Sequence, residues 1–252
     1  LQALYEKKLC TYPRTDSRYL TADMEGSVPA LAAVAAALCE MPAPKEIHAG
    51  QVCNSAKVSD HHAVLPTAAA GTTDSSALPI GEREILRLVA RGLLCAVSEA
   101  HRYAETTVTL DCGGHPFTVK GKTILVQGWK AYMTEQTDKP LPDLREGQPV
   151  LVVSIAIKEG KTAPPKHYTE DSLLAAMETA GVKEMPEDAE RKGLGTPATR
   201  ASILEKLVST GFVERKKAKK AVNLLPTHIG VALITVLPEQ LQSPQLTAEW
   251  EY

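Results

Sequence analysis

The spacing of apolar residues changes near Tyr103, and this change constrains the fold more than any other feature of the sequence. Before it, apolar residues recur every three or four positions, which indicates amphipathic helices, whereas after it they alternate, which indicates strands. The helical pattern is strongest after Pro79, where it predicts a core face made of Ile85, Leu86, Leu88, Val89, Leu93 and Leu94. The sequence therefore predicts a helical module followed by a β-rich one.

Three strands are predicted in the β-rich part, over residues 105–114, 115–133 and 148–160, joined by turns rich in glycine or proline. Pro164 and Pro165 mark the next boundary. After this boundary, Thr169 and Thr196 are typical N-caps, and each predicts the start of a helix. A basic hairpin and a further helix are predicted after the helix that begins at Thr196. Helix, hairpin and helix in this order indicate a winged-helix-like module. The predicted fold is α+β and multidomain, with domains at 1–101, 102–165 and 166–252.

Further helical segments are predicted near the N-terminus. Residues 1–8 are expected to form the end of a helix, and a longer helix is expected from an N-cap at Thr21 to about Glu40. Its most apolar part, residues 28–39, is only twelve residues long and rich in alanine, so we interpret it as a packed helix rather than a membrane span.

Net charge bounds the way in which this chain can bind a polyanion. Its 252 residues carry a formal charge of −2, so no global positive field attracts nucleic acid. Residues 206–220 nevertheless hold six basic side chains and one acidic one, while residues 134–190 hold twelve acidic and six basic ones. The basic run is either a solvated hairpin or a local contact for nucleic acid.

Five scattered cysteines without a C-x-x-C pair disfavour both a disulfide framework and a zinc ribbon. A reduced, cytosolic protein is therefore expected. No secretory signal is visible, and the sequence begins without an initiator methionine, which suggests a piece of a longer protein.

The stretch Leu9–Leu20, LCTYPRTDSRYL, is the strongest candidate for chemistry. A tyrosine has a pKa of about 10 and needs a cation or a base to act as a nucleophile. Pro13 favours an extended conformation of the preceding residue, and in an extended chain Tyr12 and Arg14 point to the same side. The guanidinium of Arg14 could then form hydrogen bonds to two phosphate oxygens at once. Thr15 and Ser17 can cap the next turn or donate to phosphate. The alternative is a structural turn with Arg14 in solvent.

A histidine in the segment DHHAVLPT, residues 60–67, is the second candidate. Histidine can donate to a phosphate oxygen or move a proton near neutral pH. The residues alone do not decide between His61 and His62, and either could instead be a structural loop residue.

The predicted helix after Thr196 is the third candidate, because Pro197 fits its first position and its free amide groups suit an anion. Thr199 and Arg200 lie in its first turn and can add a hydroxyl and a guanidinium. The alternative is a well-capped helix that binds nothing.

Several of these segments, in the same order, resemble type IA DNA topoisomerases, most closely the topoisomerase III branch. The nucleophilic tyrosine of that family lies in a T-Y-P-R-[ST]-D motif, which TYPRTD matches here. The matching segments are LYEKKLCTYPRTDSRYL (4–20), DHHAVLPT (60–67), PPKHYTEDSLLAAME (164–178), GLGTPATRASILEKLVSTGFVER (193–215) and LTAEWE (246–251).

The resemblance implies a toroidal enzyme in which a helical tyrosine-bearing domain, a β-rich arch and a winged-helix-like domain are parts. It implies that Tyr12 cleaves one DNA strand through a 5′-phosphotyrosyl intermediate, assisted by Arg14 and His61, and that religation needs no ATP. It places DNA contacts at Lys8, Thr15, Ser17, Thr196, Thr199 and Arg200. Ala198 departs from relatives that carry a hydroxyl there.

The same resemblance implies partners outside these residues. Family members bind Mg²⁺ through an acidic cluster in an N-terminal domain, and no such D-x-D arrangement occurs here, so no metal ligand is assigned to this chain. The expected partners are that missing domain and single-stranded DNA, with no membrane, in a cytoplasmic, nucleoid-associated protein. The chain alone is expected to be inactive. The alternative is a non-catalytic scaffold that binds single-stranded DNA; a tyrosine relaxase would want a histidine cluster that the scattered histidines do not provide.

Overall fold

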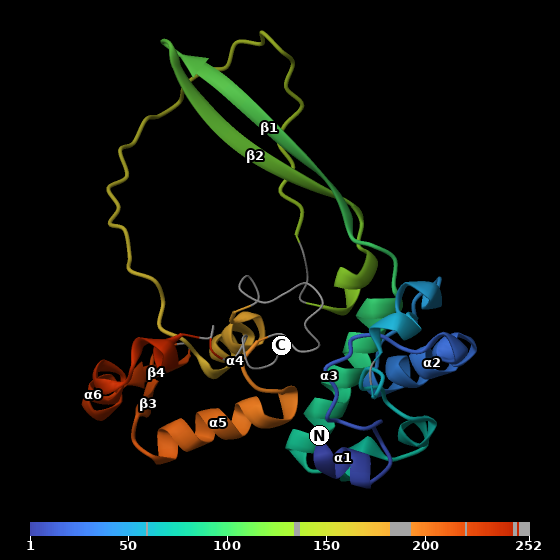
Figure 1. Cartoon of the computed structure of the whole chain (residues 1–252). Coiled ribbons are helices and arrows are strands. Elements are labelled where there is room, and N and C mark those ends of the chain that lie inside the picture. The colour runs from blue at the N-terminus through green and yellow to red at the C-terminus, as the bar shows by residue number, and fades with distance from the viewer. Residues whose placement is uncertain (59, 134–136, 182–192, 220, 244–245, 247–252) are drawn as a thin grey trace. The chain divides into compact units, whose positions relative to one another are not determined.

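The structure, a computed structural model, describes residues 1–252 except 59, 134–136, 182–192, 220, 244–245 and 247–252 (Figure 1). Most of the LTAEWE segment thus lies outside the described residues. The chain divides into two compact units, Leu1–Ala156 and Ile157–Tyr252. The predicted division into three domains stays a prediction. The helices and strands are α1 (Gln2–Glu6), α2 (Val28–Cys39), α3 (Ile80–Val97), β1 (Arg102–Cys112), β2 (His115–Val126), α4 (Glu170–Thr179), α5 (Pro197–Ser209), β3 (Val213–Lys217), β4 (Val222–Pro226) and α6 (His228–Val236).

Short 3-10 helices connect these elements. They span Ala22–Ser27, Ala49–Gln51, Ser55–Lys57, Ala68–Gly71, Ser75–Ala77, Gly128–Tyr132 and Glu239–Gln242.

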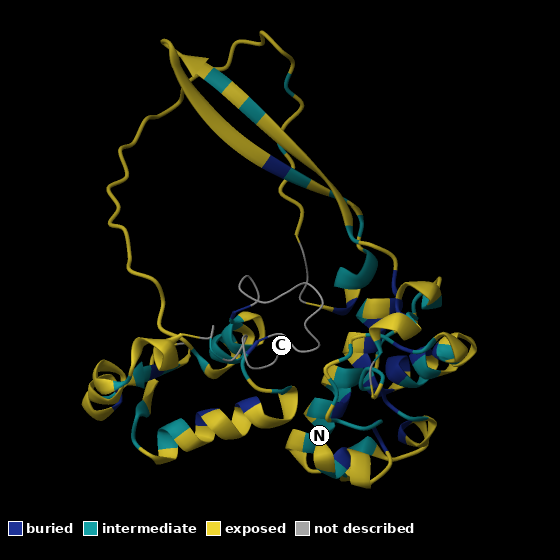
Figure 2. Cartoon of the chain, in the orientation of Figure 1, coloured by how far each residue is buried: buried dark blue, intermediate teal, exposed yellow. Residues whose placement is uncertain are grey.

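The core of the first unit lies where α2 packs against α3, and burial concentrates there in Figure 2. Alanines on the buried face of α2 allow the two helices to approach closely, and α3 presents Leu86 and Leu94, each 1% exposed or less. The sequence prediction was wrong for Leu88, which is 62% exposed. Leu88 follows Leu86 by two positions, which is about 200° around a helix, and therefore faces solvent.

The predicted helix from Thr21 to Glu40 is divided. Residues 22–27 form a 3-10 helix, and the α-helix begins only at Val28, because Pro29 lacks an amide donor and fits the first turn alone. Glu40, in a left-handed conformation with φ 54°, ends it. Together the two helices are long and apolar enough to cross a bilayer. One face of the α-helix, at Val28, Ala32 and Ala35, has no exposed surface and belongs to the core of the first unit.

Strands β1 and β2 form an antiparallel hairpin, and two of the three predicted strands are thereby confirmed. Gly113 and Gly114, at φ 62° and 84°, form the tight turn, which requires two left-handed residues. The third prediction was wrong, because residues 148–160 form no strand. Leu151 and Ile157, for example, are 86% and 94% exposed, since no neighbouring strand in the described part of the chain covers the alternating pattern.

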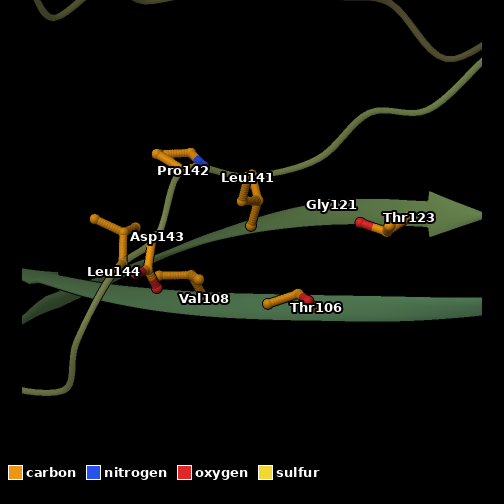
Figure 3. A pocket seen from close by; sticks show the side chains of 8 residues that line it. All are labelled: Thr106, Val108, Gly121, Thr123, Leu141, Pro142, Asp143 and Leu144. Atoms are coloured by element: carbon orange, nitrogen blue, oxygen red, sulfur yellow. The ribbon is translucent and has the colours of Figure 1, made fainter.

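The base of the β1–β2 hairpin is tied to the helical part of the same unit. The hydroxyl of Tyr132 donates to the Pro42 carbonyl at 3.0 Å, and the Trp129 amide donates to the Glu99 carbonyl at 2.9 Å. Farther along, residues 141–144 cross one face of the hairpin and enclose a shallow pocket of about 300 Å³ (Figure 3). Gly121 leaves room for the side chain of Leu141 there. We assign this pocket no function.

The second unit contains α5, the β3–β4 hairpin and α6 in the order that the sequence predicted. The predicted N-caps are confirmed, since Thr169 precedes α4 and Thr196 precedes α5. The guanidinium of Arg215 on β3 binds Glu170 of α4 and Glu205 of α5, at 2.7 and 2.6 Å. These ion pairs join the hairpin to both helices.

Candidate functional site

The tyrosine segment and the histidine segment are paired through their backbones. The Thr11 amide donates to the Leu65 carbonyl at 2.9 Å, and the Thr67 amide donates to the Leu9 carbonyl at 3.0 Å. The hydroxyl of Thr11 also accepts a hydrogen bond from the Leu65 amide at 2.9 Å. Because these bonds fix the register of two segments distant in sequence, they decide which side chains meet beside them.

Tyr12 lies beside this pairing with its ring partly exposed. Its centroid is 4.4 Å from that of His61, with the planes tilted by 47°. The ring of Tyr5, from α1, also contacts the Tyr12 ring in an edge-to-face arrangement, with the centroids 5.3 Å apart and an angle of 81° between the planes. Tilted and edge-to-face arrangements are the ones that aromatic pairs prefer, so these two contacts help to fix the position of the Tyr12 ring.

Two predicted phosphate donors in the tyrosine segment are engaged within the protein. The Thr15 hydroxyl donates to the His61 carbonyl at 2.8 Å and accepts from the Ser17 amide at 3.1 Å. The Ser17 hydroxyl contacts the Lys57 carbonyl at 3.0 Å and accepts from the Tyr19 amide. Both side chains therefore shape the loop around His61, and their contact with DNA stays a prediction.

Two predicted cations of the same segment remain available. Arg14 and Lys8 are exposed, and in the residues that the structure describes neither side chain forms an ion pair or a hydrogen bond. Lys8 has a left-handed backbone, φ 61°, and its carbonyl accepts from the Thr67 hydroxyl at 2.6 Å. The strain at Lys8 is thus held by the pairing that carries Tyr12. The predicted shared face of Tyr12 and Arg14 stays a prediction.

The start of α5 groups three other predicted residues in the second unit. The Thr199 hydroxyl accepts from the Thr196 amide at 2.9 Å, which is part of a capping box. Arg200 is only 9% exposed, and its guanidinium donates to the carbonyls of Leu194 and Gly195 at 3.0 and 3.1 Å. Arg200 therefore holds the glycine loop before α5, and a phosphate contact by it stays a prediction.

The two groups of predicted residues belong to different units, so the structure brings residues together only within each group. A metal site is not formed by either: among the described residues, no three histidine, cysteine, aspartate or glutamate side chains gather closely enough to hold an ion. The described residues therefore form no group that fits a Mg²⁺ ion.

Sequence reasoning missed the residues that position Tyr12. Tyr5, Thr11 and Thr67 contact the tyrosine or its supporting backbone, yet each has an ordinary structural appearance in the sequence. Only their place inside two of the matching segments, residues 4–20 and 60–67, hinted at them.

Comparison with known proteins covers the whole chain. The family described as DNA topoisomerase matches residues 1–252. Two similar curated proteins are DNA topoisomerase 3 of Bacillus subtilis, strain 168, at 39% identity, and DNA topoisomerase 3 of Bacillus licheniformis at 38%. Both alignments cover 100% of this chain and 37% of the relative. The chain thus spans little more than a third of the length of these relatives.

A solved structure is similar in fold. Full-length topoisomerase I from Thermotoga maritima aligns with a TM-score of 0.70 at 22% identity, over 96% of this chain and 37% of that one. The mixed helical and β architecture described above therefore matches part of a topoisomerase fold.

Proposed function

Because the chain belongs to the type IA DNA topoisomerase family, we propose that it carries the nucleophile of an enzyme that changes DNA topology without ATP. The observation that supports this most is the placement of the partly exposed Tyr12 ring against His61, at the junction of two paired motif segments. The substrate in this proposal is single-stranded DNA.

The proposed reaction is an exchange of phosphodiester bonds. The phenolic oxygen of Tyr12 attacks a backbone phosphorus, the bond to the 3′ oxygen breaks, and a 5′-phosphotyrosyl bond forms. The phenol loses its proton and the departing 3′ oxygen gains one. After another strand passes, the 3′-hydroxyl attacks the phosphotyrosyl bond and restores both starting groups. One phosphate ester replaces another in each step, so resealing needs no separate energy source.

Two neighbours of Tyr12 have proposed roles. His61 accepts or returns the phenolic proton, since its ring lies against that of Tyr12 and an imidazole nitrogen can accept or donate a proton. Arg14 stabilises charge on the phosphate oxygens, because its exposed guanidinium has no competing partner among the described residues. Lys8 and the start of α5 bind the flanking backbone. Mg²⁺ would be held by residues outside 1–252, and no step here runs through it.

The experiment is covalent capture on the full-length protein. A labelled single-stranded oligonucleotide is incubated with wild-type protein and with Tyr12→Phe, the reaction is stopped with denaturant, and the adduct is mapped by mass spectrometry. We expect a 5′-linked adduct on Tyr12 in the wild type and none in the variant. Tyr5→Phe is the matched control, because it keeps the ring contact and should keep the adduct. Absence of any adduct on the wild type with Mg²⁺ would support a non-catalytic DNA-binding scaffold instead.

A further inference from the structure

Four basic residues at the end of β3 and in the turn after it, Arg215, Lys216, Lys217 and Lys219, fall into two groups. Arg215 already has partners within the protein, because its guanidinium forms ion pairs with one carboxylate of α4 and one of α5. Lys216, Lys217 and Lys219 are exposed, and within the described part of the chain none of them forms an ion pair. Of these four cations, the structure pairs one with carboxylates and leaves three without an ion pair among the described residues.

The register of the hairpin explains why these lysines have no partner in the sheet. Lys216 lies opposite Asn223 and Lys217 lies opposite Val222, and strand β4, VNLLP, carries no acidic residue. The Ala218 amide donates to the Ala221 carbonyl at 2.7 Å and closes the turn, so Lys219 lies at the tip. Adjacent positions on a strand face opposite sides, so Lys216 and Lys217 present charge on both faces of the ribbon.

Uncompensated like charges at the end of a hairpin repel one another, and a polyanion relieves that repulsion. We propose that Lys216, Lys217 and Lys219 bind phosphates of a single-stranded DNA backbone that passes around the end of the hairpin, independently of base sequence. Lysine, a compact and flexible point charge, suits phosphate oxygens without demanding one geometry. This contact rests on the proposed function and adds to it a DNA-binding surface apart from the start of α5.

Salt dependence tests the proposal directly. Each phosphate neutralised on a single strand adds about 0.7 to the slope of log affinity against log salt, so three lost contacts should reduce the slope by about 2. The full-length protein and its K216Q/K217Q/K219Q variant are titrated with a fluorescent oligothymidylate at several salt concentrations. We expect the variant to have the shallower slope. Lys→Arg at the same three positions should keep the wild-type slope, because charge is retained.

The matched control is K158Q/K161Q/K166Q, which removes three exposed lysines from the same unit and should leave the slope nearly unchanged. Equal slopes for wild type and the hairpin variant would overturn the proposal, as would an equal loss in the control. Hairpin-dependent binding to anionic lipid vesicles without a change in the DNA slope would also overturn it. Capture on Tyr12 is read in parallel: an intact adduct with unchanged slope refutes the hairpin contact alone, whereas a missing wild-type adduct refutes the proposed function.

Discussion

The rings of Tyr12 and His61 lie with their centroids 4.4 Å apart, although the two residues come from separate motifs. The hydroxyl of Thr15 donates a hydrogen bond to the His61 carbonyl. The backbone pairing of residues 9–11 with residues 65–67 holds together the two segments that carry these rings. A change in either support should alter the chemistry proposed for Tyr12 without touching its phenol.

Thr15→Val tests that support. It keeps the size of the side chain but removes the donor to the His61 carbonyl, which should cost about 1 kcal/mol of unfolding free energy. If His61 moves as a result, the rate of adduct formation on Tyr12 should fall between about tenfold and a hundredfold. Denaturant titration and single-turnover capture measure the two effects. Thr73→Val, which removes a hydroxyl bond to Ala69 in another loop, should leave capture at the wild-type rate.

Residues 1–252 expressed alone should fail to relax supercoiled DNA in the presence of Mg²⁺. The reason is that the described residues gather no cluster of metal-binding side chains near Tyr12 or elsewhere. Gel electrophoresis of a supercoiled plasmid after incubation is the measurement, with the full-length protein as positive control. Relaxation by the isolated chain would contradict both this prediction and the assignment of Mg²⁺ to residues outside it.

Arg200→Ala should destabilise the second unit by about 2 kcal/mol, because the nearly buried guanidinium donates to two loop carbonyls that would lose a charged partner. Thermal unfolding followed by circular dichroism reports the loss. Lys206→Ala on the same helix is the control, since Lys206 is exposed and forms no ion pair in the described part of the chain. An Arg200 variant as stable as the control would show that the loop before α5 does not depend on these bonds.

The ion pairs of Arg215 should make stability depend on pH in the acidic range. The hydrogen bond and charge of Arg215 hold the pKa of Glu205 below its usual value. A carboxyl whose pKa is lower in the folded state stabilises fully above the unfolded pKa of about 4.3 and loses that contribution as pH falls through the folded value. Arg215→Gln should therefore lower the melting temperature at neutral pH, and the difference from wild type should shrink in acid and in high salt. A constant difference at every pH would contradict this origin.

The cysteines should react with a maleimide in an order set by burial. Burial raises the pKa of the Cys10 thiol to about 11, so little reactive thiolate forms near neutral pH. Cys112, at the exposed end of β1, should be labelled first and Cys10 last, which peptide mass mapping can measure. In denaturant all five should react at similar rates. Early labelling of Cys10 in the native protein would mean that the strand-like pairing beside Tyr12 opens readily.

Local sequence determined much of this protein. Helix α3, the Gly113-Gly114 turn and the caps at Thr169 and Thr196 follow from rules that act over a few residues, so pattern and capping chemistry sufficed to predict them. The candidate nucleophile was also readable, because Tyr12 belongs to a contiguous motif.

Only the tertiary structure decided which distant groups meet. The contact of Tyr12 with His61 depends on hydrogen bonds between two segments far apart in sequence. The contact of Tyr12 with Tyr5 and the bonds of Arg200 to the Leu194 and Gly195 carbonyls join nearer residues, but they depend on how each loop closes, which helix and strand patterns do not predict. The strand predicted at residues 148–160 does not form, for a related reason. Alternating apolar residues allow a segment to pair, but a strand forms only where another backbone supplies the hydrogen bonds, and the local sequence does not decide this.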